Sequence, residues 1–80
     1  MPTFLRIRGD RFFAYALEGN EPPHVHIEHG SGQMKVWLGD VSLAWSRELK
    51  PAEIRAALQL TCEHRALLLQ AWHEWDQRKN

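Results

Sequence analysis

Apolar and polar residues alternate in short runs through the first half of the chain. In the run Phe4–Arg8, Leu5 and Ile7 fall on one face and two arginines on the other. Alternation with a period of two is typical of a strand that is buried on one face. Together with an aromatic and apolar run at 11–17 and similar runs further on, it predicts about five strands, at residues 4–8, 11–17, 24–28, 33–38 and 41–45.

Glycine-containing turns separate these runs and indicate how neighbouring strands pair. Gly9-Asp10 is predicted to form a two-residue hairpin turn, because glycine accepts the positive φ that such turns need. In that register Arg8 lies opposite Arg11.

The second hairpin is expected to place its apolar residues on one face, because direct antiparallel partners share a face. Ile27 then lies opposite Val36, whereas a slip of one residue would bury a lysine. This register pairs Glu28 with Lys35 and His26 with Trp37.

The period changes to that of a helix after residue 50. Pro51 suits the first helical position, and Glu53 suits the positive end of the helix dipole. The apolar stripe expected to pack on the sheet contains Ile54, Leu58, Leu68, Leu69, Trp72 and Trp75. One helix over 51–78 would be about 42 Å long, wider than a globule of this size. The sequence therefore leaves open a continuous helix or a break near Cys62–Arg65.

These elements predict an α+β fold, with an antiparallel sheet of about four to five strands followed by a C-terminal helical segment on one face. Residues 1–80 form a single domain, with the strands within 4–45 and the helical segment within 51–78. The other face of an antiparallel sheet can remain open to water. It is expected to carry Arg6, Arg8, Tyr15, His24, His26, Glu28, Lys35 and Trp37.

Composition and charge narrow the function classes. Ten Lys and Arg balance ten Asp and Glu, so the molecule as a whole does not attract polyanions and only a local patch can do so. The one cysteine, Cys62, excludes an internal disulfide and a cysteine-based zinc site. No apolar run approaches the roughly 20 residues that cross a bilayer, and charges come too early for a signal peptide. We expect a cytoplasmic protein that does not bind membranes.

The pair His24 and His26 is the strongest candidate for chemistry, because residues two apart on a strand share a face. Two imidazoles and Tyr15 could act on RNA as acid, base and charge stabiliser without a metal. The substrate-binding candidates, which combine charge with stacking, are Arg6, Arg8, Lys35 and Trp37. The alternative is a pair of solvent-facing histidines that pack on their neighbours.

A zinc site is a further alternative, because three histidines suffice for a catalytic zinc. His29, however, has the wrong parity to share a strand face with His26, and no cysteine or acidic cluster completes the set. We therefore predict no metal and no cofactor, and keep a metal-binding protein as an alternative reading of the same histidines.

The string Glu21-Pro22-Pro23-His24-Val25-His26 carries a family resemblance. With Met1-Pro2-Thr3, Arg11-Phe12-Phe13, Lys35, Trp37-Leu38 and the terminal Leu67–Trp72, the chain resembles small bacterial proteins of domain-of-unknown-function family 4160. The resemblance implies no assigned reaction. It implies a gene beside that of another small family, as in toxin–antitoxin modules.

The leading hypothesis is a toxin-like component that acts on RNA through the His24/His26 face and is held in check by a small partner protein encoded nearby. The alternative is a non-catalytic module whose same face docks that partner. The sequence does not decide whether the protein is an enzyme, and it does not indicate an oligomeric state.

Overall fold

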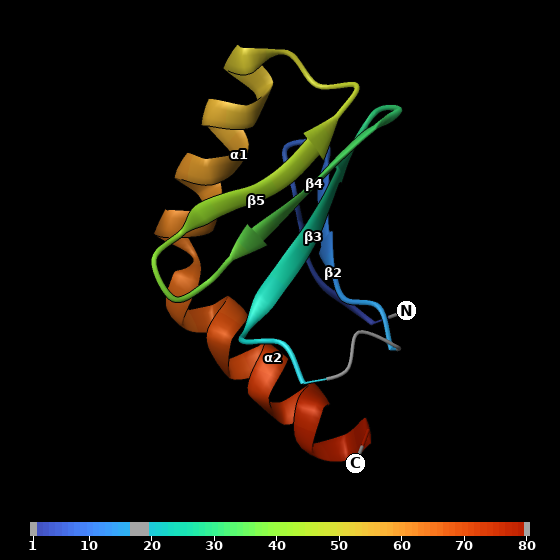
Figure 1. The fold of residues 1–80 in the computed structure, drawn as a ribbon, viewed down its shortest axis with the longest axis vertical. Helices are drawn as coiled ribbons and strands as arrows, with labels where there is room; N and C mark the ends of the chain where they lie inside the picture. Colours follow the sequence, from blue (N-terminus) through green and yellow to red (C-terminus); the bar gives the residue numbers. More distant parts are fainter. Residues whose placement is uncertain (1, 17–19, 80) are drawn as a thin grey trace.

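The computed structural model describes residues 2–16 and 20–79. One antiparallel sheet has its strands in chain order, and two helices follow it on one face (Figure 1). The strands are β1 (Thr3–Ile7), β2 (Asp10–Phe13), β3 (His24–His29), β4 (Gly32–Trp37) and β5 (Ser42–Arg47). The helices are α1 (Pro51–Glu63) and α2 (Arg65–Lys79). The predicted α+β fold is confirmed, although β1 begins one residue earlier and β5 ends two residues later than expected. The strand predicted at 11–17 is wrong in extent, because β2 ends at Phe13; residue 17 lies outside the described residues.

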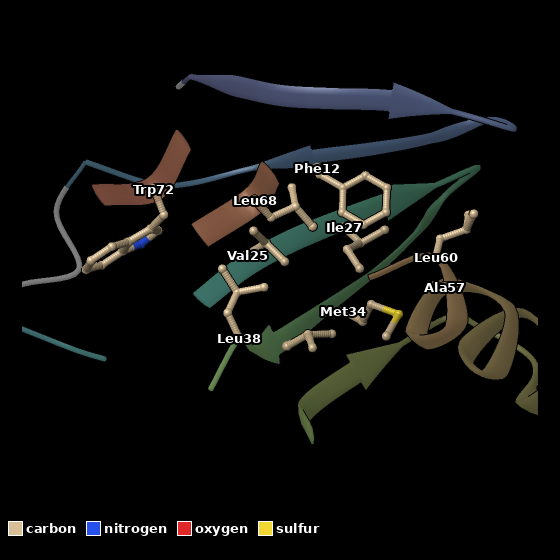
Figure 2. Packing of buried hydrophobic residues seen from close by; sticks show 10 residues of the cluster. Phe12, Val25, Ile27, Met34, Leu38, Ala57, Leu60, Leu68 and Trp72 are labelled. Atoms are coloured by element: carbon tan, nitrogen blue, oxygen red, sulfur yellow. The ribbon is translucent and has the colours of Figure 1, made fainter. Parts of the chain in front are cut away.

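The core lies between the helices and the sheet face that we call the inner face. Side chains from β2, β3 and β4 point toward both helices (Figure 2). The buried cluster contains Phe12, Val25, Ile27, Met34, Val36, Leu38, Ala57, Leu60, Leu68 and Trp72. Of the predicted helical stripe, Leu68 and Trp72 are buried, and the other members pack against the cluster while partly buried. Alternation therefore identified the inner face of the sheet, whereas on α1 the buried Ala57 and Leu60 lie outside the predicted stripe and its members Ile54 and Leu58 are only partly buried.

The predicted register of the β3–β4 hairpin is wrong by two residues. Val25 lies opposite Val36, and Ile27 lies opposite Met34. The turn consists of Gly30 and Ser31, and Gly30 takes the positive φ of 58° that its first position requires. Moving the turn by one residue shifts the pairing of the two strands by two residues. Because side chains alternate with a period of two, every side chain keeps its predicted face.

The β1–β2 hairpin differs from the prediction in the same way. Its turn is Arg8-Gly9, with φ values of 52° and 83°, rather than Gly9-Asp10. Two positive φ values are typical of the type I′ turn, which matches the twist of the flanking strands. Consequently Arg6, not Arg8, lies opposite Arg11.

The helical segment breaks at His64, which resolves the alternative that the sequence left open. Arg65 begins α2 and donates from Nε to the carbonyl oxygen of Leu38 (2.7 Å) and from Nη2 to that of Gly39 (3.0 Å). The guanidinium thus ties the helix break to the turn after β4. Neither helix in the described part of the chain is long and apolar enough to cross a membrane.

Gly32 lies where the chain leaving β5 approaches β4. A Cβ on this residue would meet the carbonyl oxygen of Glu48, and would lie 2.5 Å from Cδ2 of Leu49. The first residue of β4 must therefore be glycine for reasons of space.

We expect Gly32→Ala to lower the free energy of unfolding by about 1–3 kcal/mol, the usual effect of overpacking. Gly39→Ala is the matched control, because nothing lies within 4 Å of its added methyl group; it should change stability by less than about 0.5 kcal/mol. Urea unfolding followed by tryptophan fluorescence measures both. Equal stabilities of the two variants would contradict this close approach.

Candidate functional site

The sheet face turned away from the helices gathers nearly all the candidate residues. We call it the outer face. Register places Phe13 opposite His26, His26 opposite Lys35, and Lys35 opposite Trp45. Its side chains are Arg6, Arg11, Phe13, His24, His26, Glu28, Gln33, Lys35, Trp37, Trp45 and Arg47, with Tyr15 beyond the end of β2.

The three predicted catalytic residues lie together on this face. The ring centroids of His24 and His26 are 5.5 Å apart, and the Tyr15 ring is 4.6 Å from that of His26. Nδ1 of His24 donates to the carbonyl oxygen of Pro22 (2.9 Å), since that oxygen can only accept. In the neutral ring, Nε2 of His24 is then the acceptor nitrogen. Proximity alone assigns no role, and the catalytic roles stay predictions.

The expectation that both histidines face water is wrong. Each is only 2% exposed. The Phe13 ring stacks on that of His26 at 5.6 Å, and the Trp45 ring lies 5.8 Å away. Trp37 contacts His24 edge-on at 5.8 Å. The outer face therefore carries its own small aromatic layer over His26, whereas the His24 ring also lies 6.2 Å from that of Trp72 on α2.

Lys35 belongs to the same cluster but has a different partner from the one predicted. Its Nζ lies 2.5 Å from Oε1 of Glu21 and 4.8 Å from the centroid of the Trp37 ring. The expected pair with Glu28 is wrong, because the register places Glu28 beside Arg11 instead, at 3.2 Å. Lys35 and Trp37 therefore lie beside the histidines, but the expectation that Lys35 faces water is wrong, because it is buried and ion-paired.

The two predicted arginines lie further along the sheet. Arg6 and Arg8 line a pocket at the β1–β2 turn, together with Arg11 and Glu28. This pocket contains neither histidine of the cluster. The candidate residues thus divide into a central cluster and an arginine-lined end of the same face.

Two features of this face were missed from the sequence. Trp45 is 40% exposed and its ring contacts that of His26, and Arg47 donates to Oε1 of Gln33 at 3.2 Å. Alternation along 41–45 already placed Trp45 in a strand, and its partner in β4 is Lys35. The signal was available, but only the pairing of β5 with β4 shows which residues it covers.

A second polar cluster lies on the inner face, at the opposite end from α2. Nδ1 of His29 donates to Oδ1 of the buried Asp10 (2.6 Å), and its Nε2 lies 3.5 Å from Oε2 of Glu53. Oε1 of Glu53 also accepts from the backbone N–H of Lys50 at 2.8 Å. These contacts join β2, β3 and the start of α1. The residue pattern contains no signal for these contacts, because it predicts a turn at Gly9-Asp10.

The parity argument for His29 is confirmed, since it faces the helices while His26 faces away from them. The three histidines are therefore not brought together as a zinc site. Within residues 2–16 and 20–78, no group of three or more His, Cys, Asp or Glu side chains is arranged to hold a metal ion.

A family model described as Domain of unknown function (DUF4160) matches residues 9–73. The chain belongs to this family. The DUF4160 match includes β2–β5, all of α1 and the part of α2 that carries Leu68 and Trp72. No curated protein and no solved structure matches the chain. For this DUF4160 protein, function is therefore argued from the outer face itself.

Because His26 is buried among aromatic rings, we expect His26→Ala to lower the free energy of unfolding by about 2–4 kcal/mol, as large-to-small core substitutions do. The exposed Trp45 gives the comparison, since Trp45→Ala should cost clearly less. Thermal and urea unfolding of both variants measure this. A loss below about 0.5 kcal/mol for His26→Ala would mean that the imidazole is not part of a packed layer.

Proposed function

We propose that this protein is the toxin-like component of a bacterial two-gene module and that it acts on RNA through the outer face. The observation that carries the proposal is the interleaving of cationic and aromatic side chains on one sheet face. Proteins that bind single-stranded nucleic acid combine these two elements, cations along the backbone and rings on which bases stack.

The charge of the outer face supports RNA as the ligand. The whole chain is neutral, so an excess of cations here is a local feature. Glu28 and Glu21 compensate Arg11 and Lys35. Arg47 has only the neutral Gln33 as its side-chain partner in the described chain. A patch with uncompensated arginines attracts phosphates even on a neutral protein.

The aromatic side chains supply the second element. Trp45 is exposed at 40%, while Tyr15, which contacts His26, and Trp37, which contacts His24, are half-buried. Stacking of one base on an aromatic ring is worth about 1–3 kcal/mol and tolerates any sequence. We therefore expect binding of single strands with little sequence preference.

Cleavage is a separate step of the proposal. In a metal-independent mechanism, one imidazole takes the proton of the attacking 2′-hydroxyl and the other protonates the leaving oxygen. The spacing of His24 and His26 supports this pairing, whereas their burial opposes it. A bound strand would have to displace the ring of Trp45 or Tyr15 to reach them.

The burial of the histidines favours a second candidate, a non-catalytic module that docks a small partner protein. β5 lies at the edge of the sheet, and all of its residues after Ser42 are exposed, including Leu43 and Trp45. An edge strand with exposed apolar side chains can pair with a strand of another protein. The two candidates differ in whether RNA binds the isolated protein.

RNA binding is tested by fluorescence anisotropy with an unstructured oligonucleotide. Trp45→Ala should weaken binding about fivefold or more, because it removes a stacking ring. Arg47→Gln should lower the slope of log K against log salt by about 0.7. Arg55→Gln, an exposed cation on α1, is the control and should change neither quantity. Absence of RNA binding, with a purified partner protein bound at β5, would favour the docking module.

The chemical step is tested with His24→Gln and His26→Gln, which keep most of the side-chain volume. Each should abolish growth arrest on expression and RNA cleavage in the presence of a chelator, while circular dichroism and RNA binding stay unchanged. A folded double variant that keeps full activity would end the ribonuclease hypothesis.

A further inference from the structure

A pocket of about 370 Å³ lies at the end of the outer face, beside the β1–β2 turn. Three guanidinium-bearing residues line it, Arg6, Arg8 and Arg11, and we call it the arginine pocket. It is bordered by Glu28 on β3, two residues along the strand from His26. The pocket is therefore continuous with the proposed RNA-binding face.

The sheet register creates an unfavourable pair in this pocket. Arg6 and Arg11 are direct cross-strand partners. Like charges directly opposite each other destabilise a sheet. A turn shifted by one residue, to Gly9-Asp10, would place Arg8 opposite Arg11 instead, so both registers pair two arginines at this end of the sheet. The folded chain therefore holds two guanidinium groups side by side at the edge of the pocket.

The turn itself carries a second local cost. Arg8 occupies the first central position with a φ of 52°, in the left-handed region. At this position of a type I′ turn, asparagine or glycine is favoured, because a long side chain gains nothing from the conformation. An arginine here is unfavourable for the turn but projects a third cation at the pocket.

Carboxylates near the pocket do not neutralise all three arginines. Glu28 pairs with Arg11, and the carboxylate of Asp10 is hydrogen-bonded to His29 on the inner face. Among the described residues, neither Arg6 nor Arg8 has an ion-pair partner.

Arg11 is held in place before any ligand arrives. Its Nη1 donates to the Thr3 hydroxyl at 3.1 Å, its Nε donates to Glu28 at 3.2 Å, and its guanidinium lies 4.1 Å above the Phe13 ring. A guanidinium that is already ordered loses little entropy on binding an anion.

We propose that the arginine pocket binds the dianion of a phosphate monoester. Two uncompensated cations match two negative charges, whereas an internal phosphodiester carries one charge and has two oxygens blocked by ester bonds. Guanidinium groups bind phosphate oxygens bidentately, which favours the less substituted phosphate. The ligand is either the terminal phosphate of an RNA strand or a free phosphate compound.

The RNA version rests on the proposed function and extends it. The rise from Glu28 to His26 is about 7 Å along β3. A terminal phosphate in the pocket would therefore place the next nucleotides over His26 and Trp45. The protein would then act at RNA ends rather than at internal sites.

The first experiment compares octanucleotides of one sequence that carry a 5′-phosphate, a 3′-phosphate or only hydroxyl ends. One phosphorylated form should bind the protein about tenfold more tightly, as expected for charge-assisted hydrogen bonds. Arg6→Gln and Arg8→Asn should remove this ratio. Arg47→Gln should weaken binding of all three oligonucleotides equally, because Arg47 lies outside the pocket.

Since Asn-Gly is the preferred type I′ pair, Arg8→Asn should be at least as stable as the parent protein, so misfolding cannot explain a loss of the affinity ratio.

The second experiment separates the two sources of the phosphate. Pyrophosphate should raise the melting temperature of the parent protein, relative to sodium chloride of equal ionic strength, but not that of the Arg6→Gln, Arg8→Asn double variant. If pyrophosphate raises the melting temperature while no RNA binds, the arginine pocket binds a free phosphate compound, and the proposed function is wrong. If RNA binds without preference for a terminal phosphate and pyrophosphate gives no shift, the inference is overturned and the proposed function stands.

Discussion

The two-residue turn at Gly30-Ser31 is the constraint on which the rest of the molecule depends. With Gly32 packed against the chain that leaves β5, it sets the pairing of β3 with β4. That pairing places the apolar residues of both strands under the helices. It also brings His26 beside Lys35 on the outer face, and the next pairing adds Trp45. The core and the candidate site thus lie on opposite faces of the sheet and depend on the same strand pairing. A change in the turn would disturb both.

The outer face consequently combines two properties that oppose each other. Aromatic rings cover the imidazoles and stabilise them as part of a packed layer, yet the same rings form the surface on which a ligand would stack. Binding needs only the exposed part of this layer, whereas acid–base chemistry needs it to open. RNA binding and RNA cleavage are therefore separable claims for this DUF4160 protein, and the geometry supports binding more directly.

Sequence reasoning predicted the faces well and the pairing poorly, for one physical reason. Alternation determines which side of the sheet a residue occupies, but a shift of two residues leaves every side unchanged. Only the position of the turn distinguishes such registers. In the β1–β2 turn Arg8 takes a positive φ, which an arginine in the sequence does not indicate. The burial of His26 depends on Tyr15 and Trp45, and that of His24 on Trp37 and Trp72, which all come from other segments of the chain. The contact of Arg65 with the turn after β4 likewise explains the helix break only once both are in place.

The central claim is that the outer face, and not the helical side, is the surface that meets RNA. The most direct test is titration of the ¹⁵N-labelled protein with an unstructured RNA oligonucleotide, followed by two-dimensional NMR. The account predicts shifts of the indole N–H signal of Trp45 and of the amide signals of β3, β4 and β5, with the exposed side of α1 unaffected. Shifts confined to the helices, or none at RNA concentrations that saturate other single-strand-binding proteins, would contradict it.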